Sequence, residues 1–240
     1  MTTELKIILI VAVVLIVLLA IVLSSRSRIK KIFKKYLEVD NKHDLTGAQF
    51  ASASLQYLNL EEVKLAVKDG ELIDAYYPKQ RTLLMSRDVC DKASIASIAI
   101  VAHELGHAVQ HKEGTPLYFI CALFGKLAKF FNKFFIPLII ASVVMMIVKA
   151  PDLSIGLILL YVALGIFGFN FLTKILNIPL EYDASKRALR YLKEYNFVTS
   201  SEYGRAKKLL GVAAQTYIAS LFDGLIIFGN KISRIFYNKL

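Results

Sequence analysis

Cysteine is scarce in this chain. There are two, Cys90 and Cys121, and neither belongs to a Cys-x-x-Cys pair. A disulfide framework is therefore excluded as the basis of the fold, and both thiols are expected to be reduced and buried. Histidine is also scarce, so few imidazoles are available for a metal site; the four are His43, His103, His107 and His111.

Acidic residues are too few to balance the basic ones, with 19 Asp and Glu against 30 Lys and Arg and a net charge of +11. In a soluble protein this charge would suggest a nucleic-acid partner. However, 56% of the residues are hydrophobic and the mean hydropathy is +0.52, which favours a chain with membrane spans. A lipid bilayer explains the basic charge better, and we expect no nucleic-acid partner.

Charge is almost absent from three apolar segments, Leu5–Leu23, Phe134–Val148 and Leu153–Leu172. Their apolar length predicts about three transmembrane helices. In the first segment the positive charges follow the apolar run, and no small-x-small cleavage site ends it. It is therefore interpreted as an uncleaved anchor and not as a secretory signal. The basic residues between 26 and 35 predict that its N-terminus lies outside the cell.

This orientation predicts a multi-pass protein of the cell membrane in which residues 26–133 lie in the cytoplasm. The second and third spans then form a hairpin whose turn, Lys149–Asp152, is too short to hold a domain. The chain returns to the cytoplasm near Lys174, so any later side chain shares a side of the membrane with His103. A last helical pattern, Arg205–Gly229, is not expected to cross, because a crossing would put the basic C-terminus outside.

The predicted fold class is a mainly α-helical membrane protein with a small α+β, zincin-like catalytic region in the cytoplasm and a C-terminal amphipathic helix. Five regions are expected: an anchor over 1–25, the zincin-like region over 26–115, an interfacial helix over 116–133, a transmembrane hairpin over 134–173, and a cytosolic or interfacial helical region over 174–240.

Within 26–115 the pattern predicts a helix near Leu45–Leu58, capped by Thr46. Three short strands are expected at Val63–Val67, Leu72–Tyr76 and Thr82–Met85. A helix over Ser94–His111 follows. The third strand is interpreted either as an ordinary packed strand or as an edge to which an extended peptide can add.

The sequence His103-Glu104-Leu105-Gly106-His107 lies inside this last helix. Residues four apart share one face of a helix, so both imidazoles can reach one tetrahedral zinc ion while Glu104 reaches a zinc-bound water. From typical His and Glu abundance, the motif occurs by chance in about one such chain in a hundred. Gly106 leaves space between the two histidines. The pattern therefore predicts metal-assisted hydrolysis.

A catalytic zinc ion needs a third protein ligand from another part of the chain. His111 continues along the same straight helix and is expected to be an exposed polar residue, while His43 belongs to a polar, solvated loop. Better candidates are Glu181 and Asp183, which follow Pro179, a residue expected at a helix start. The two acids point in different directions on a helix, so at most one should bind metal. Alternatively, neither binds metal, and both are simply acidic residues that the helix dipole favours in a first turn.

Together these motifs resemble the YugP-like neutral zinc metallopeptidases of bacterial membranes. The resemblance covers most of the chain and rests on Leu45–Ala48, Tyr77–Pro78, Leu84–Ser86, Ala102–His111, Pro179–Ser185 and Arg187–Leu189. It implies a peptidase with one zinc ion and, by analogy with gluzincin-like membrane peptidases, Glu181 as the third ligand. Those gluzincin-like peptidases carry an aspartate four residues after the glutamate, where this chain has Ser185. Asp183 is therefore expected either to support a histidine or to pair with Arg187.

The resulting hypothesis is a zinc metalloendopeptidase in which His103, His107 and Glu181 hold the metal and Glu104 is the general base. Its substrates are expected to be peptides or membrane proteins at the cytosolic face. The donor that stabilises the oxyanion is left open among four candidates, Tyr76, Tyr77, Tyr182 and Arg187.

Two other functions are alternatives to this one. A non-catalytic membrane scaffold would use zinc only to join the motif helix to the segment at Glu181, with a closed fourth coordination position. A zinc transporter is disfavoured, because the predicted spans contain no histidine and almost no charge. The sequence does not indicate an oligomeric state.

Overall fold

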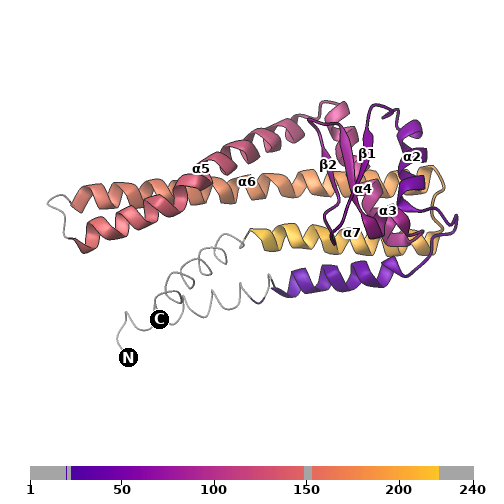
Figure 1. The fold of residues 1–240 in the computed structure, drawn as a ribbon, viewed down its shortest axis with the longest axis horizontal. Coiled ribbons are helices and arrows are strands. Elements are labelled where there is room, and N and C mark those ends of the chain that lie inside the picture. Colours follow the sequence, from indigo (N-terminus) through magenta and orange to yellow (C-terminus); the bar gives the residue numbers. More distant parts are fainter. Residues whose placement is uncertain (1–19, 21–22, 149–152, 222–240) are drawn as a thin grey trace.

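The computed structural model describes residue 20, residues 23–148 and residues 153–221. The fold is mainly helical with one small sheet (Figure 1). The predicted anchor Leu5–Leu23 lies almost entirely outside the described residues, and a first helix covers 23–37. The elements that follow are α2 (Gly47–Tyr57), β1 (Lys64–Lys68), β2 (Ala75–Tyr77), β3 (Thr82–Ser86), α3 (Arg87–Asp91), α4 (Ile95–Lys112), α5 (Pro116–Ile147), α6 (Leu153–Glu194) and α7 (Ser200–Ser220).

The sheet has its strands in the order β1-β3-β2, so β3 is central. β1 runs parallel to β3, and β2 runs antiparallel to it with Tyr76 opposite Leu83. The expectation that Thr82–Met85 could be a free edge was therefore wrong, because both of its sides are paired. The strand is central because Leu83 and Met85 belong to the hydrophobic core. β2 is instead the edge strand that contacts α4.

α4 is the buried centre of the globular part. Ser94 begins it, since its side chain accepts a hydrogen bond from the backbone N–H of Ser97. The small and apolar residues of the helix are buried on several faces, and α2, α6, α7 and the sheet all pack on it. Burial on several faces fixes the rotation of α4, which confirms the predicted helix and orients the motif within it.

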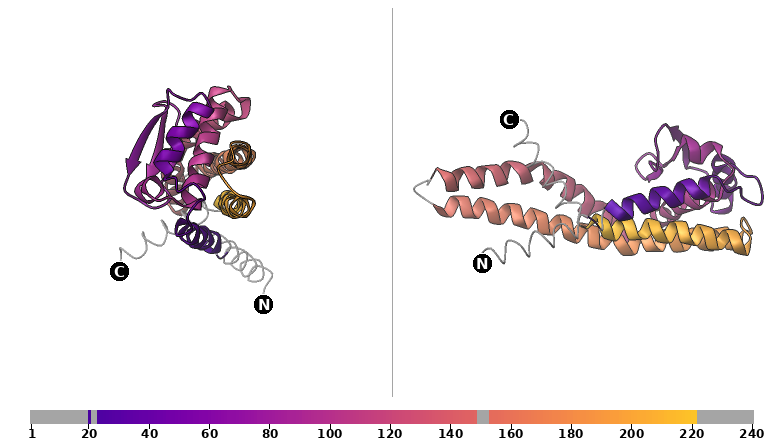
Figure 2. Two further views of the ribbon diagram at one scale, coloured as in Figure 1. Left: turned by 90° about the vertical axis from the view of Figure 1, so that its right-hand side faces the viewer. Right: turned by 90° about the horizontal axis from the view of Figure 1, so that it is seen from below.

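α5 and α6 form a long antiparallel pair that extends away from the globular part (Figures 1 and 2). Among the described residues, Pro116–Met146 and Ile155–Glu194 are long and apolar enough to cross a membrane. Between the two helices, Asn132 and Asn170 exchange side-chain hydrogen bonds of 3.1 and 2.9 Å, which join otherwise apolar surfaces. The outer faces of α5 and α6 expose large apolar side chains, including Phe130, Phe134, Ile140, Val143, Ile158 and Leu164.

Both helices continue across places where the sequence predicted a boundary. The interfacial helix over 116–133 and the second span are one helix, α5. The helix start expected at Pro179 is wrong, because Pro179 lies inside the 42-residue helix α6. A proline there removes a backbone hydrogen bond at a cost of about 3 kcal/mol, which packing of α6 against α4, α5 and α7 offsets. α6 therefore carries Glu181 without a break from the apolar pair into the globular part.

α7 lies beside α6 and near the first helix (Figure 2). A capping box begins it, and it starts before the predicted segment Arg205–Gly229. The part of that segment beyond residue 221 lies outside the described residues. Arg28 of the first helix donates a hydrogen bond to Gln215 of α7 at 3.2 Å. α7 thus covers one side of α4 and is tied to the helix 23–37.

Candidate metal centre

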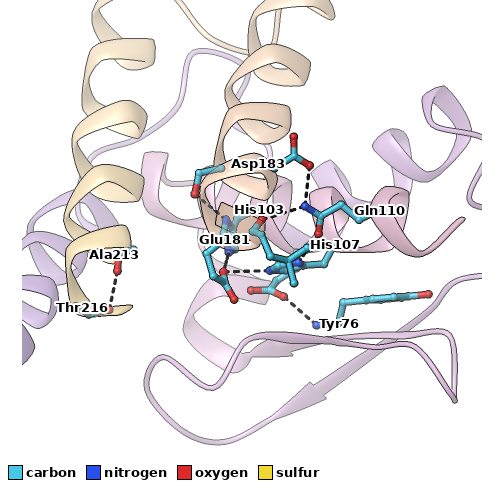
Figure 3. A network of polar contacts seen from close by, with 11 residues as sticks. Tyr76, His103, His107, Gln110, Glu181, Asp183, Ala213 and Thr216 are labelled. Atoms are coloured by element: carbon cyan, nitrogen blue, oxygen red, sulfur yellow. Dashed lines mark hydrogen bonds and ion pairs between the residues drawn. The ribbon is translucent and has the colours of Figure 1, made fainter. Parts of the chain in front are cut away.

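Two histidines of α4 and one glutamate of α6 meet where these helices touch (Figure 3). The Nε2 atoms of His103 and His107 each lie 3.2 Å from Oε2 of Glu181. The three ligand atoms lie within 4.8 Å of one another, as in a site that could hold a metal ion. Two imidazoles and one carboxylate form a donor set that suits zinc. The structure therefore brings together the three side chains that the sequence singled out.

Gly106 allows the two helices to approach each other. A Cβ atom at this position would lie 2.7 Å from the backbone oxygen of Ala184 in α6, closer than real contacts permit. Since Glu181 is about one turn before Ala184, the same approach carries its carboxylate to the histidines. Gly106 thus makes room for α6, and not only for the two imidazoles as the motif alone suggested.

Gln110 determines the hydrogen bonding of His107. Its side chain is fully buried, and its amide nitrogen donates to the backbone oxygen of Leu180 at 3.0 Å and to Asp183 at 2.8 Å. The amide oxygen faces Nδ1 of His107 at 2.9 Å and can only accept, so Nδ1 carries the proton. In the neutral ring Nε2 is then unprotonated, which is the state that a metal ligand requires.

Asp183 extends this network away from the metal centre. Its carboxylate accepts a second hydrogen bond from Arg187 at 2.6 Å, and Arg187 also pairs with Glu113 at 2.6 Å. The sequence left two alternatives for Asp183, support of a histidine or pairing with Arg187. Both occur, because Asp183 reaches His107 through Gln110.

His103 has a different partner. Its Nδ1 atom lies 3.1 Å from the hydroxyl oxygen of Ser185, in a buried contact. Ser185 follows Glu181 by one turn on the same face of α6, so both side chains reach His103 together. A neutral hydroxyl therefore contacts this histidine.

Glu104 lies beside the ligand cluster. Its carboxylate accepts a hydrogen bond of 2.9 Å from the backbone N–H of Tyr76 in the edge strand β2. Burial raises the pKa of Glu104, and the neighbouring His103 and His107 only partly oppose that shift. A carboxylate with a raised pKa takes up a proton more readily, which is the property of a general base.

A cavity of about 320 Å³ borders Glu104 and His107. β2, the start of α5, α6 and the end of α7 contribute to its walls. Sequence reasoning missed one of its residues, Tyr217 of α7. Burial and the nearby carboxylates of Glu181 and Glu104 raise the pKa of this phenol. No motif marks Tyr217, because only the packing of α7 on α4 and α6 brings it here.

The oxyanion donors expected from the sequence are less well placed. Tyr77 and Tyr182 are 45% and 67% exposed. Arg187 is engaged by Asp183 and Glu113. Tyr76 lines the cavity, but its hydroxyl is engaged by Nδ1 of His111 at 3.0 Å.

His111 is not an exposed polar residue, contrary to expectation. Its Nδ1 atom lies 3.0 Å from the hydroxyl of Tyr76. Its ring is 5.5 Å from that of Tyr118 and 6.0 Å from that of Phe119. The start of α5 folds back over the end of α4 and covers it. His43 is exposed in its loop, as predicted.

Two comparisons with known proteins found matches. A family model described as "Putative neutral zinc metallopeptidase" matches residues 9–233, which include α4 and α6. The chain is 31% identical over 207 residues to "Putative membrane protease YugP" of Bacillus subtilis (strain 168), which covers 84% of this chain and 85% of that protein. No solved structure matches the chain.

Proposed function

We propose that this chain, which belongs to the family of neutral zinc metallopeptidases, is a membrane-anchored zinc metalloendopeptidase that cleaves peptides or membrane proteins. The observation that carries the proposal is the convergence of His103, His107 and Glu181, with Glu104 and a cavity beside them. A catalytic zinc site uses three protein ligands and keeps one position open, whereas a structural site is closed.

The donor set fits one zinc ion, which when bound would polarise the scissile carbonyl and acidify the attacking water. Glu104 accepts the proton of that water and delivers it to the leaving amine. The N–H of Tyr76 orients the carboxylate of Glu104 at the edge strand. An extended substrate can lie along β2, since its outer side is unpaired by other described strands.

We assign stabilisation of the oxyanion to Tyr217. Its phenol lines the cavity at Glu104 and lies next to Glu181. The raised pKa keeps the hydroxyl protonated, so it can donate to an oxygen that gains negative charge. This assignment replaces the four candidates drawn from the sequence.

We place the site on the cytoplasmic side of a multi-pass protein. α5 and α6 are candidate spans, and α6 carries Glu181 beyond its most apolar part. The first helix is rich in basic residues, which favour the cytoplasmic side of a membrane. These residues are Arg26, Arg28, Lys30, Lys31, Lys34 and Lys35. A site so near the end of the apolar pair suits substrates that emerge from the membrane.

A non-catalytic zinc scaffold is the competing function. The close contact between Gly106 and Ala184 would serve such a scaffold as well. A scaffold has no use for a half-buried carboxylate that adjoins both the ligands and a cavity, whereas a hydrolase needs both. We therefore favour the peptidase.

The test compares the purified, zinc-loaded parent with Glu104→Gln in lipid vesicles, using a peptide library. Glu104→Gln should retain one zinc per chain and lose at least about a hundredfold in cleavage rate, since it removes the general base. Glu61→Gln, in an exposed turn, is the matched control and should cleave as the parent does. Equal cleavage by Glu104→Gln, or no zinc-dependent cleavage by the parent, would contradict the proposal.

A further inference from the structure

A second cavity, of about 220 Å³, borders Glu104 from the side of His103. It shares Asp74, Glu104 and Tyr217 with the cavity on the side of His107. The two cavities therefore meet at the residue assigned as general base. Most of the remaining lining of the second cavity is apolar: Ile29, Leu72, Ile100, Leu209, Leu210 and Ala213. Hereafter it is called the apolar chamber.

Leu72 forms part of the chamber in a strained backbone conformation. Its φ is 54°, in the left-handed region that residues with a Cβ atom seldom adopt. The preceding Glu71 links this loop to the first helix, because its carboxylate pairs with Lys30 and Lys34 at 3.6 and 3.5 Å. Ile29 is on the same helix, so these pairs connect the two segments that supply Leu72 and Ile29 to the chamber.

α7 provides another wall, and Figure 3 shows it beside the metal centre. Ala213 and Thr216 face the chamber from this helix. Thr216 donates its hydroxyl to the backbone oxygen of Ala213 at 2.6 Å, so that hydroxyl is already engaged. The methyl side chain of Ala213 leaves room that a larger residue would fill.

We propose that the apolar chamber is the specificity pocket of the enzyme and takes an uncharged, apolar side chain of leucine or phenylalanine size next to the scissile bond. This inference rests on the proposed peptidase function. A peptide bond held at Glu104 would have a flanking side chain at the mouth of the chamber. Apolar cavities of about 150 Å³ bind benzene, so the chamber has room for a phenyl ring.

Charged side chains suit the chamber poorly. An acidic side chain would lie beside Asp74 and Glu104, which are themselves acidic. A basic side chain would lose its hydration among apolar walls. It would also find Asp74 already engaged, since the backbone N–H and hydroxyl of Ser86 donate to that carboxylate at 2.6 and 3.2 Å.

The experiment uses the zinc-loaded, full-length protein in lipid vesicles with a peptide library, and mass spectrometry locates the cleaved bonds. The parent should prefer leucine, phenylalanine or methionine over glycine and aspartate at one flanking position, by about tenfold or more, as expected for a filled apolar pocket. Ala213→Leu should abolish that preference while small residues are still accepted.

Ala214→Leu is the matched control. Ala214 is the next residue of α7 and lines a different groove, together with Lys186 and Tyr203, so this variant should keep the parent's preference. Ile29→Ala should act in the opposite direction to Ala213→Leu and extend acceptance to tryptophan. It keeps the test decisive if Ala213→Leu fails to fold.

The outcomes separate the two proposals. Glu104-dependent cleavage with no apolar preference in the parent, or with an unchanged preference in both Ala213→Leu and Ile29→Ala, overturns the specificity pocket alone. Absence of any zinc-dependent cleavage by the parent overturns the peptidase function and this inference with it.

Discussion

Gln110 has a role that other residues of similar size cannot fill. The side chain must accept from Nδ1 of His107 while it donates to Leu180 and Asp183. Glutamate of the same length has no donor at neutral pH, and leucine has neither donor nor acceptor. The buried amide of Gln110 therefore sets the tautomer of His107, although Gln110 is not itself a candidate metal ligand.

Gln110→Leu should bind zinc about 10–100-fold more weakly, as is typical when the partner of a metal-ligating histidine is lost. The buried Nδ1–H of His107 would also lose its acceptor, at a cost of about 1–3 kcal/mol. Competition with a zinc chelator measures the affinity. Gln56→Leu, on the exposed side of α2, is the control, and equal affinities of parent and Gln110→Leu would contradict the assigned tautomer.

His107 makes the metal-free protein sensitive to pH. Burial disfavours its charged form, but the hydrogen bond and charge of Glu181 outweigh burial and raise the pKa of His107 from 6.5 to about 9. The folded state thus binds this proton more tightly than the unfolded state. The stabilisation is fully present below about pH 6.5 and is lost as the pH rises through about 9.

Thermal unfolding of the chelated protein should therefore show stability falling between pH 6.5 and pH 9. Zinc must displace the proton of His107, so zinc affinity should increase over the same range. His107→Gln is the comparison variant and should show a shallower fall. Stability that rises between these pH values would contradict the assignment.

At the scale of elements, the site depends on how closely α4 and α6 approach. Gly106 is the contact point, and Ala184 is fully buried against it. A helix with glycine in its interior is less stable than one with alanine by roughly 0.5–1 kcal/mol. The packing of α6 against α4 must therefore offset this loss of helix stability.

Gly106→Ala should separate α4 from α6, because its Cβ atom would meet the backbone oxygen of Ala184 at 2.7 Å. Overpacking of this kind costs about 1–3 kcal/mol, and zinc binding should weaken as Glu181 moves away. Gly204→Ala in α7 is the control, since a Cβ atom there meets nothing within 4 Å. It should be neutral or slightly stabilising. Calorimetry and zinc titration of both variants make the comparison, and equal zinc affinity would contradict this role of Gly106.

The elements that the sequence predicts well are those defined locally. α4 follows from the cap at Ser94, its apolar periodicity and the motif itself. The faces of α6 also follow from helical spacing, because residues four apart share a face; Glu181 therefore lies with Ser185, and Asp183 with Arg187. These local signals give both halves of the metal centre.

The elements predicted poorly depend on contacts between distant segments. Pro179 signals a helix start, but packing on three neighbouring helices keeps α6 continuous. The central place of β3 follows from its parallel pairing with β1, which no local pattern encodes. Tyr217 reaches the cavity only because α7 returns to α4, so neither spacing nor composition could identify it.

At the scale of the whole molecule, the candidate metal centre is joined to an apolar helix pair through α6. The first helix and α7 lie together on one side of the globular part (Figure 2). The proposed orientation puts the candidate metal centre, the first helix and α7 in the cytoplasm. That orientation can be tested in intact cells.

Lys79→Cys, in the exposed turn between β2 and β3, should resist a membrane-impermeant maleimide in intact cells and react after permeabilisation. The native Cys90 and Cys121 are buried and should give little background. Asp152→Cys tests the other side, because the predicted turn 149–152, outside the described residues, is expected to face the exterior. Labelling of Lys79→Cys in intact cells would contradict the cytoplasmic assignment.

The proposed peptidase requires an open zinc site made of His103, His107 and Glu181, and zinc X-ray absorption of the purified, full-length protein can detect such a site. We predict two imidazole nitrogens and oxygen ligands at about 2.0–2.2 Å, with no sulfur at about 2.3 Å. Glu104→Gln should leave this spectrum unchanged, and a hydroxamate inhibitor should alter it by occupying the open position. A thiolate ligand, or a spectrum unaffected by hydroxamate and by Glu181→Ala, would contradict the claim.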